Sequence, residues 1–310
     1  MKILLTGGAG YLGSVLCEHL LADGHEVVVI DNFMFGQTSL FHLCANPGFE
    51  IIKGDARDMG LIGRELRKAD AVIPLAALVG APLCDREPIS AVSINYEAIR
   101  DLNRLRSSSQ LIVYPTTNSG YGTQTGDAFC TEETPLEPIS IYGKTKVDAE
   151  KEVLDSKNSI SLRLATVFGC SPRMRIDLLV NHFTYAAATD GYIVIFEKDF
   201  KRNYIHIRDV ADCFLYCLGN AQRMAGKPYN LGLDAANLSK EDLALKVKKH
   251  VPKFYIHFSE VGSDPDKRNY IVSNQRLKDA GFEAKRNLDQ GITELLKAYR
   301  MVRKTQFGNV

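Results

Sequence analysis

Short hydrophobic runs alternate with amphipathic stretches through the first half of the chain. Six of these runs lack polar alternation, as strands covered on both faces do. They are Lys2–Leu5, Glu26–Ile30, Glu50–Ile52, Ala71–Leu75, Leu111–Val113 and Ser159–Leu164. The helices predicted between them are Leu12–Leu21, which stops before Gly24, a segment after Ser90, and about Tyr142–Leu154. This rhythm predicts an α/β fold built on a doubly wound (Rossmann) parallel sheet.

The pattern changes after about Ala165. The elements predicted there are a helix near Leu178–Ala188, a strand at Ile193–Phe196, a charged loop before Tyr204, and helices at Lys240–His250 and Leu288–Val302. The Gly/Asp/Pro-rich segment Gly262–Asp266 is expected to be a loop that closes over a ligand. We therefore expect a main domain of residues 1–168, which also receives about 203–233, and a smaller C-terminal α/β lobe within residues 169–310.

Composition excludes several classes of partner. With 310 residues, 45% of them hydrophobic, and a net charge of +1, the chain can bury a large core but has no broad basic field for nucleic acid or an anionic membrane. The run Met1–Leu5 is too short for a signal peptide, so we expect a cytoplasmic protein. Its seven cysteines are scattered without ligand spacing, which predicts reduced thiols and no metal site. Cys213 and Cys217 are expected on one buried helical face.

A glycine-rich turn lies between the first strand and the first helix. The sequence Thr6-Gly-Gly-Ala-Gly-Tyr-Leu-Gly13 places Gly7, Gly10 and Gly13 at intervals of three residues. Without side chains the backbone can turn tightly against a pyrophosphate, which the N-terminus of the next helix attracts. This context predicts a dinucleotide site that includes Tyr11 and Leu12; a tight turn without a ligand is the alternative.

Acidic residues after the second and third strands fit the rest of a dinucleotide. Asp31 stands about twenty residues beyond the glycine turn, with Asn32 beside it. A carboxylate there accepts bonds from both adenosine ribose hydroxyls and repels a 2′-phosphate, which favours NAD over NADP. Asp31 as a helix cap or turn residue is the alternative. Asp55 and Ala56, after the third strand, lie where an adenine edge would come.

A phenol and an ammonium are spaced for one face of a helix. Tyr142 and Lys146 stand four residues apart in Tyr-Gly-Lys-Thr-Lys. A nearby cation favours tyrosinate and is expected to lower the phenol pKa, which suits Tyr142 to remove a hydroxyl proton. A plain surface Tyr-Lys pair is the alternative, but the motif follows the fifth strand and the polar run Thr116–Gly122.

Over nearly its whole length the chain resembles the extended short-chain dehydrogenase/reductase family of nucleotide-sugar epimerases, dehydratases and dehydrogenases. The resemblance implies that Thr117 is the catalytic Ser/Thr, Tyr142 the base and Lys146 a ligand of the nicotinamide ribose of NAD. It also implies further cofactor-binding residues, with Pro74 in place of the usual His before them: Leu75, Ala76, Ala77, Asn95 on the following helix, and Thr166 where the family often has Asn.

One departure from the family concerns the reaction. Family dehydratases follow the catalytic Thr with Asp-Glu, the acid and base that eliminate water, whereas this chain has Asn118-Ser119. Neither side chain titrates usefully near neutral pH, so dehydration is disfavoured. The resemblance then implies oxidation at C4 of the sugar, which is either reversed on the other face by an epimerase or released as a keto sugar by a dehydrogenase.

The resemblance also implies the substrate end of the site. Arg202 and Arg268 match the two family arginines that grip the diphosphate, although a solvated charge run is the alternative for both. Asn181 and Phe196 match residues that contact the phosphates and the base.

Longer strings, such as Ser171-Pro-Arg-Met-Arg-Ile-Asp-Leu-Leu-Val-Asn181, resemble the bacterial GDP-heptose C4-dehydrogenases of surface-polysaccharide pathways. This implies a GDP-sugar and a sugar pocket lined by Val79, Cys84, Asn118, Ser119, Arg173 and Arg175. Two alternatives to the dehydrogenase function remain: a 4-epimerase with tightly bound NAD, and a non-catalytic dinucleotide-sensing protein. The family habit of pairing through the helix that bears Tyr142 implies a homodimer.

Overall fold

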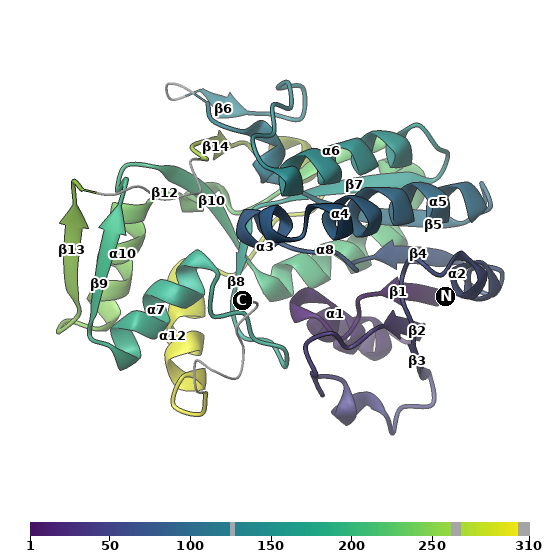
Figure 1. Ribbon diagram of the computed structural model, residues 1–310, viewed down its shortest axis with the longest axis horizontal. Helices are drawn as coiled ribbons and strands as arrows, with labels where there is room; N and C mark the ends of the chain where they lie inside the picture. Colours follow the sequence, from purple (N-terminus) through teal and green to yellow (C-terminus); the bar gives the residue numbers. More distant parts are fainter. Residues whose placement is uncertain (125–127, 262–267, 303–310) are drawn as a thin grey trace.

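A computed structural model describes residues 1–124, 128–261 and 268–302. Its main element is a sheet of seven parallel strands in the order β11-β7-β5-β4-β1-β2-β3 (Figure 1). The strands are β1 (Lys2–Thr6), β2 (Glu26–Asp31), β3 (Phe49–Lys53), β4 (Ala71–Pro74), β5 (Leu111–Thr117), β7 (Ser159–Leu164) and β11 (Lys227–Leu231). The predicted doubly wound parallel sheet is confirmed.

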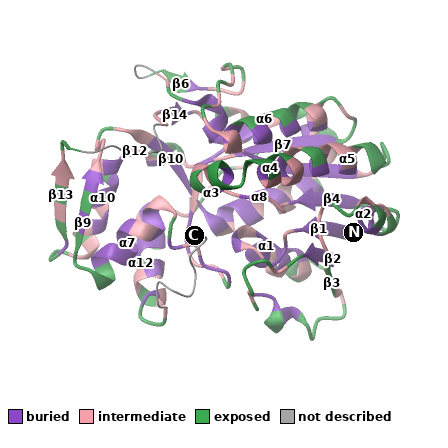
Figure 2. Ribbon diagram, in the orientation of Figure 1, coloured by how far each residue is buried: buried purple, intermediate pink, exposed green. Residues whose placement is uncertain are grey.

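Helices cover both faces of this sheet. The helices on one face are α1 (Tyr11–Ala22) and α8 (Ile207–Gly219), and those on the other are α2 (Met59–Leu66), α5 (Ala98–Leu105) and α6 (Ile141–Leu154). Each face of the sheet packs against its helices in a hydrophobic core of its own. Successive residues of β1 point to opposite cores, with Ile3 and Leu5 on the α1 side and Leu4 on the α6 side. Buried residues accordingly concentrate along the strands and the inner faces of the helices (Figure 2).

A second group of elements lies beside the sheet, at the left of Figure 1. Three strands pair in the order β12-β10-β8, β13 pairs with β9, and β14 pairs with β6. Their bounds are β6 (Phe129–Cys130), β8 (Thr166–Phe168), β9 (Tyr192–Phe196), β10 (Lys201–His206), β12 (Asn237–Ser239), β13 (Tyr255–Ser259) and β14 (Ile271–Val272). The larger helices of this part are α7 (Leu179–Thr189), α10 (Lys240–His250) and α12 (Leu288–Ala298).

Short helical segments complete the described chain. They are η1 (Phe41–Leu43), α3 (Ala81–Arg86), α4 (Pro88–Val92), the π-helical turn η2 (Ser93–Glu97), η3 (Asn118–Tyr121), α9 (Ala221–Met224), η4 (Asp234–Ala236) and α11 (Gln275–Asp279). Within the described ranges, no helix has both the length and the apolar character that a bilayer crossing requires.

Several predicted boundaries are wrong for identifiable reasons. The charged loop before Tyr204 is the first half of β10, where Arg202 and Asn203 are buried and pair with β12. The fifth strand runs to Thr117, because its polar end pairs with β7 as its hydrophobic start does. The last helix ends at Ala298, four residues before the predicted end at Val302.

Two other predictions concern single features. Cys213 and Cys217 are buried in α8 as predicted. The predicted loop Gly262–Asp266 lies outside the described residues.

Candidate active site

The glycine turn brings the first strand against the loop after β4. Gly7 has a φ of +73°, and a Cβ atom there would lie 2.5 Å from the backbone nitrogen of Ala76. A Cβ on Gly13 would lie 2.6 Å from the carbonyl oxygen of Gly7 and the Cα of Gly8. Gly10 occupies the N-cap of α1 and has no side chain to cap the first amides of that helix. The turn therefore forms a bare backbone cradle at a helix N-terminus, which fits a pyrophosphate.

Asp31 lies beside this cradle at the end of β2. Its Oδ2 accepts a hydrogen bond from the Ala9 amide at 2.9 Å, and its Oδ1 accepts one from the Phe33 amide at 2.8 Å. Burial raises the pKa of this carboxyl, and the two amide bonds oppose that effect. The next residue, Asn32, is exposed and accepts a bond from the Met34 amide. Asp31 is thus fixed where the sequence places a ribose ligand.

The other predicted cofactor residues divide into two groups. Ala76 borders the glycine turn through its backbone nitrogen, and Leu75 and Ala77 flank it. Asp55 instead forms an ion pair with Arg57, in which Nη2 and Oδ2 are 2.6 Å apart. Asn95 is 1% exposed, and its amide both accepts from the Leu78 N–H and donates to the Leu78 carbonyl at 2.9 Å. Asn95 therefore fixes the loop after β4 through the backbone of Leu78.

The three predicted catalytic residues meet at the end of β5. Thr117 ends that strand, and its hydroxyl lies close enough to the phenol of Tyr142 on α6 to lower the pKa of that phenol slightly. The Thr117 hydroxyl also lies 2.9 Å from Ser119 Oγ and accepts the Ser119 amide at 3.1 Å. Lys146 is one helical turn beyond Tyr142 and is 5% exposed, with Nζ 4.2 Å from the centroid of the Tyr114 ring.

Burial dominates the acid–base properties of this group. It raises the pKa of Tyr142, and the Arg268 and Arg175 guanidiniums and the nearby Thr117 hydroxyl act in the opposite direction. Burial also lowers the pKa of Lys146 to about 7. The expectation that Lys146 gives Tyr142 a low pKa is therefore wrong for the protein alone, because the loss of water around the phenol outweighs the cations.

The two arginines predicted to grip a diphosphate have different surroundings. Arg268 donates from Nη1 to Ser119 Oγ, which places its guanidinium beside the catalytic group. Arg202 is 1% exposed, with its guanidinium carbon 5.5 Å from the centroid of the Tyr270 ring. Phe196 ends β9, where its carbonyl accepts a bond from Lys240 Nζ. Arg202 is far more buried than a solvated charge run would be.

The segment after β8 carries three more predicted substrate residues. Arg173 is 4% exposed and lies over Phe35, with 4.8 Å between the guanidinium carbon and the ring centroid. Arg175 forms an ion pair with Asp177. Asn181 is fully buried, accepts from the Gly169 amide at 3.1 Å and lies 3.2 Å from the Tyr11 hydroxyl. Its polar atoms therefore join this segment to the glycine turn.

The remaining predicted residues are three of the sugar pocket, Asn118, Cys84 and Val79, and one of the cofactor site, Thr166. Asn118 is fully buried, and neither polar atom of its amide has a hydrogen-bond partner among the described residues. Cys84 is buried and lies 3.3 Å through Sγ from the Leu78 carbonyl oxygen. Val79 and Thr166 are half-buried, at the loop after β4 and at the start of β8. Asn118 thus offers an unused donor and acceptor next to Thr117.

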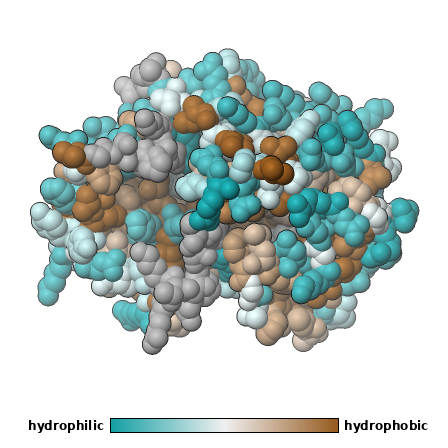
Figure 3. All heavy atoms as spheres, viewed as in Figure 1, coloured by the Kyte–Doolittle hydropathy of each residue, from teal (hydrophilic) through white to brown (hydrophobic). Residues whose placement is uncertain are grey.

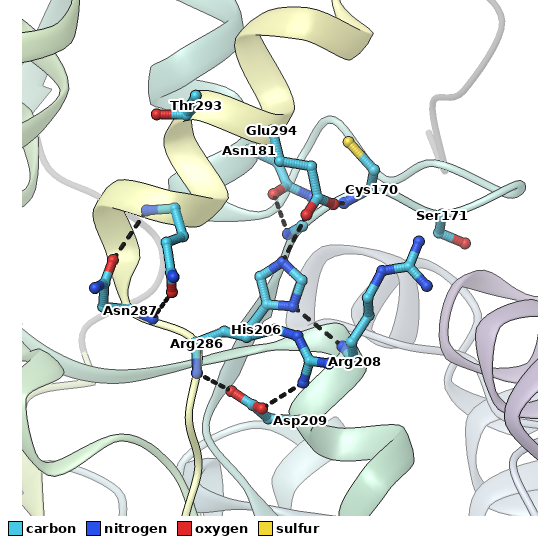
Figure 4. Close-up of polar contacts among 12 residues, drawn as sticks. Cys170, Ser171, Asn181, His206, Arg208, Asp209, Arg286, Asn287, Thr293 and Glu294 are labelled. Atoms are coloured by element: carbon cyan, nitrogen blue, oxygen red, sulfur yellow. Dashed lines mark hydrogen bonds and ion pairs between the residues drawn. The ribbon is translucent and has the colours of Figure 1, made fainter.

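A partly buried network that the sequence analysis missed anchors the segment after β8 (Figure 4). His206 Nδ1 accepts the Arg208 amide at 3.2 Å, so the ring proton is on Nε2, which lies 3.1 Å from Glu294 Oε2. Glu294 Oε1 accepts the Cys170 amide at 2.7 Å. Helix α12 therefore holds the first residues of this segment, although no local sequence pattern marks Glu294.

Comparison with known proteins places this geometry in a family. Residues 3–232 match the model of the NAD dependent epimerase/dehydratase family. The chain is 31% identical to the uncharacterized UDP-glucose epimerase YtcB of Bacillus subtilis, over 84% of this chain and 85% of that protein. It is 28% identical to a UDP-glucose 4-epimerase of Lactobacillus helveticus, over 86% and 87%. The fold matches that of dTDP-glucose 4,6-dehydratase from Bacillus anthracis in complex with NAD, with a TM-score of 0.85, 19% identity, and coverage of 99% of this chain and 98% of that one.

The glycine cradle gives a first prediction. Gly13→Ala places a methyl group 2.6 Å from the Gly7 carbonyl oxygen, so the turn must open and NAD affinity should fall at least about tenfold. Isothermal titration with NAD measures this. Gly219→Ala is the matched control, because its Cβ meets no described atom within 4 Å. Equal affinity of Gly13→Ala and the control would contradict the placement of the pyrophosphate.

The His206–Glu294 pair gives a second prediction. Although burial raises the pKa of Glu294, its bonds with His206 and the Cys170 amide lower it to about 2, from a usual value of 4.5. A carboxyl with a lowered pKa stabilises the fold above its usual pKa and loses that contribution as the pH falls through the lowered value. Glu294→Gln should therefore cost about 1–2 kcal/mol at pH 7, after allowance for partial exposure.

Urea unfolding at several pH values tests this. The difference between Glu294→Gln and the unmodified protein should shrink as the pH falls from about 4.5 towards about 2. Glu260→Gln, at an exposed position, should match the unmodified protein throughout. A stability difference that does not change with pH would show that the Glu294 carboxylate is not held as the structure shows.

Proposed function

The chain belongs to the NAD dependent epimerase/dehydratase family, and from this premise we propose that it oxidises the C4 hydroxyl of the sugar of a nucleotide-diphosphosugar. The observation that carries the proposal is that Thr117, at the end of β5, and Tyr142, on α6, lie beside each other. These two groups can hold one substrate hydroxyl between them. The intact set of Thr117, Tyr142 and Lys146 argues against a non-catalytic dinucleotide-sensing protein.

The protein residues that would hold NAD follow from the cradle. The backbone of the glycine turn would take the pyrophosphate, Asp31 the adenosine ribose and Lys146 the nicotinamide ribose. Asn32, Asp55, Ala56 and Thr166 remain proposed neighbours of the cofactor. When bound, NAD supplies a hydride acceptor for carbon C4 of the sugar.

The chain's own residues would remove the proton of the sugar hydroxyl. Tyr142 as phenolate takes the proton of the sugar hydroxyl at its Oη, and Thr117 donates a hydrogen bond to the same sugar oxygen. The ammonium of Lys146, one turn away on the same helix face, favours the phenolate. Because burial raises the pKa of Tyr142, the cations around it are needed for that state.

The residues after Thr117 limit what can follow oxidation. Asn118 and Ser119 offer hydrogen bonds but no titrating acid or base near neutral pH, so elimination of water is disfavoured. Asn118 would bind the sugar through its unused amide atoms, within the pocket proposed for Val79, Cys84, Arg173 and Arg175. We propose release of a 4-keto sugar; the similarity to UDP-glucose epimerases supports the alternative, a 4-epimerase that retains NAD.

The nucleotide would bind at the end marked by Arg202 and Arg268. Two guanidiniums from separate segments suit a diphosphate. The Ser171–Asn181 string supports a GDP-heptose-like substrate consumed in surface-polysaccharide synthesis, whereas the similar proteins named above act on UDP- or dTDP-sugars by their names. Asn181 and Phe196 belong to this proposal at the phosphates and the base.

A homodimer remains part of the proposal. Hydrophobic side chains gather on the surface over α4 (Figure 3), where Ile89 is 84% exposed and Val92 is 39% exposed. An apolar surface of this kind next to α6 is consistent with pairing of two copies through these helices.

The base assignment gives a third prediction. Tyr142→Phe should lower turnover at least about a hundredfold, because it removes the proton acceptor, while NAD affinity is kept. Stopped-flow absorbance of NADH and titration with NAD measure the two effects. Tyr192→Phe, at a 59% exposed position in β9, should behave as the unmodified protein. Normal turnover by Tyr142→Phe would overturn the proposed chemistry.

The fate of the sugar gives a fourth prediction. Incubated with NAD and GDP-heptose, GDP-mannose, UDP-glucose or dTDP-glucose in turn, the protein should convert a GDP-sugar to a 4-keto product with one NADH formed per sugar. Proton NMR of the product tests this. An inverted C4 centre without NADH would establish the epimerase instead. A dehydrated sugar would contradict the role given to Asn118 and Ser119.

A further inference from the structure

A buried ion pair lies between α6 and the sheet, behind the catalytic helix. Glu150 is 2% exposed and Arg163, on β7, is 6% exposed. Arg163 donates to Glu150 Oε1 from Nη2 at 2.6 Å and from Nε at 3.0 Å, and Ser161 Oγ donates to Oε2 at 2.8 Å. A buried pair of this kind adds little net stability over apolar residues of the same volume. Its place in the fold therefore needs another explanation.

Glu150 continues the row of functional side chains along α6. Tyr142, Lys146 and Glu150 follow at intervals of four residues, so they share one face of the helix. The Glu150 carboxylate favours the charged form of Lys146, against the burial that lowers the pKa of this lysine to about 7. The catalytic ammonium thus has an anion one turn behind it.

The other titratable groups around Lys146 do not supply that charge. They are Tyr142 on the same helix, Tyr114 on β5 and Cys84 on α3. Burial raises the pKa of Tyr114 and of Cys84, so both stay neutral near pH 7. Glu150, which pairs with the Arg163 guanidinium, is the carboxylate in this set.

Arg163 determines where the Glu150 carboxylate points. It holds both oxygens towards the strands, so that within the described chain the Lys146 ammonium forms no direct ion pair with Glu150. Arg163 is itself fixed from its far side, where Nη1 donates to the Tyr121 hydroxyl at 3.1 Å and to the Glu132 carbonyl at 3.2 Å. The carboxylate therefore acts on Lys146 through space and not through a direct contact.

We propose that Glu150 is a positioning residue that keeps a proton on Lys146, and that Arg163 acts through Glu150 by holding its carboxylate off that ammonium. The inference rests on the proposed function, in which Lys146 supports the base Tyr142. It assigns a role in the reaction to two residues that do not reach the substrate.

The fifth prediction is measured on the full-length protein without substrate. Competitive labelling of amines with acetic anhydride across a pH series, followed by tandem mass spectrometry, gives the titration midpoint of Lys146; the exposed Lys144 in the same peptide is an internal control. Glu150→Gln should lower the Lys146 midpoint by about one pH unit, because burial is no longer opposed. Arg163→Gln should raise it, because the released carboxylate can approach the ammonium.

Three further variants make the test specific. The double variant Glu150→Gln/Arg163→Gln should match Glu150→Gln alone, since Arg163 acts through the carboxylate. Glu65→Gln removes another buried carboxylate, on α2 and 4% exposed, and should leave the Lys146 midpoint unchanged. If Glu150→Gln does not fold by circular dichroism, Glu150→Asp keeps the charge on a shorter side chain and should shift the midpoint down by a smaller amount.

Two outcomes would overturn the inference: a folded Glu150→Gln, or Glu150→Asp in its place, with an unchanged Lys146 midpoint, or an Arg163→Gln that shifts in the same direction as Glu150→Gln. Neither outcome depends on turnover. Failure of every nucleotide-sugar to react would overturn the proposed function and leave these midpoints as they are, so the two failures are distinguishable.

Discussion

The packing of α6 against the ends of β5 and β7 is the constraint on which the rest of the site depends. This contact buries the Lys146 ammonium and the Glu150 carboxylate and half-buries the Tyr142 phenol on the same helix face and the Thr117 hydroxyl. In the low-dielectric interior each charge acts strongly on its neighbours, and burying an unpaired charge costs free energy. The chemistry available to Tyr142 is therefore a property of the whole interface between α6 and the sheet.

The second part of the chain is tied to this interface through the segment after β8. Asn181 joins Gly169 to Tyr11 of the glycine turn, and Glu294 joins Cys170 to His206. These contacts connect α7, α12 and β10 to the start of α1. The sugar pocket proposed for that segment would be held in register with the dinucleotide cradle, as hydride transfer between two ligands requires.

Local patterns in the sequence predicted what depends on local structure. The glycine spacing, Asp31 at the end of β2 and the four-residue spacing of Tyr142 and Lys146 all lie where the patterns placed them. The patterns failed where long-range burial decides. The polar half of β10 has the composition of a loop but is a strand because β12 pairs with it. The pKa of Tyr142 is determined by burial more than by the neighbouring Lys146. Glu294 contacts His206 although the two residues are 88 positions apart in the sequence.

The electrostatics of Tyr142 give the two parts of the chain different tasks. The first part buries the phenol and thereby raises its pKa, whereas the guanidiniums that lower it, Arg268 and Arg175, come from the second part. Both arginines already have partners, Ser119 and Asp177. A diphosphate or sugar that moved either arginine would change the charge felt by the base. In the proposed function, substrate binding and readiness of the phenolate would therefore be coupled through the same two side chains, which would link proton removal to the presence of a sugar.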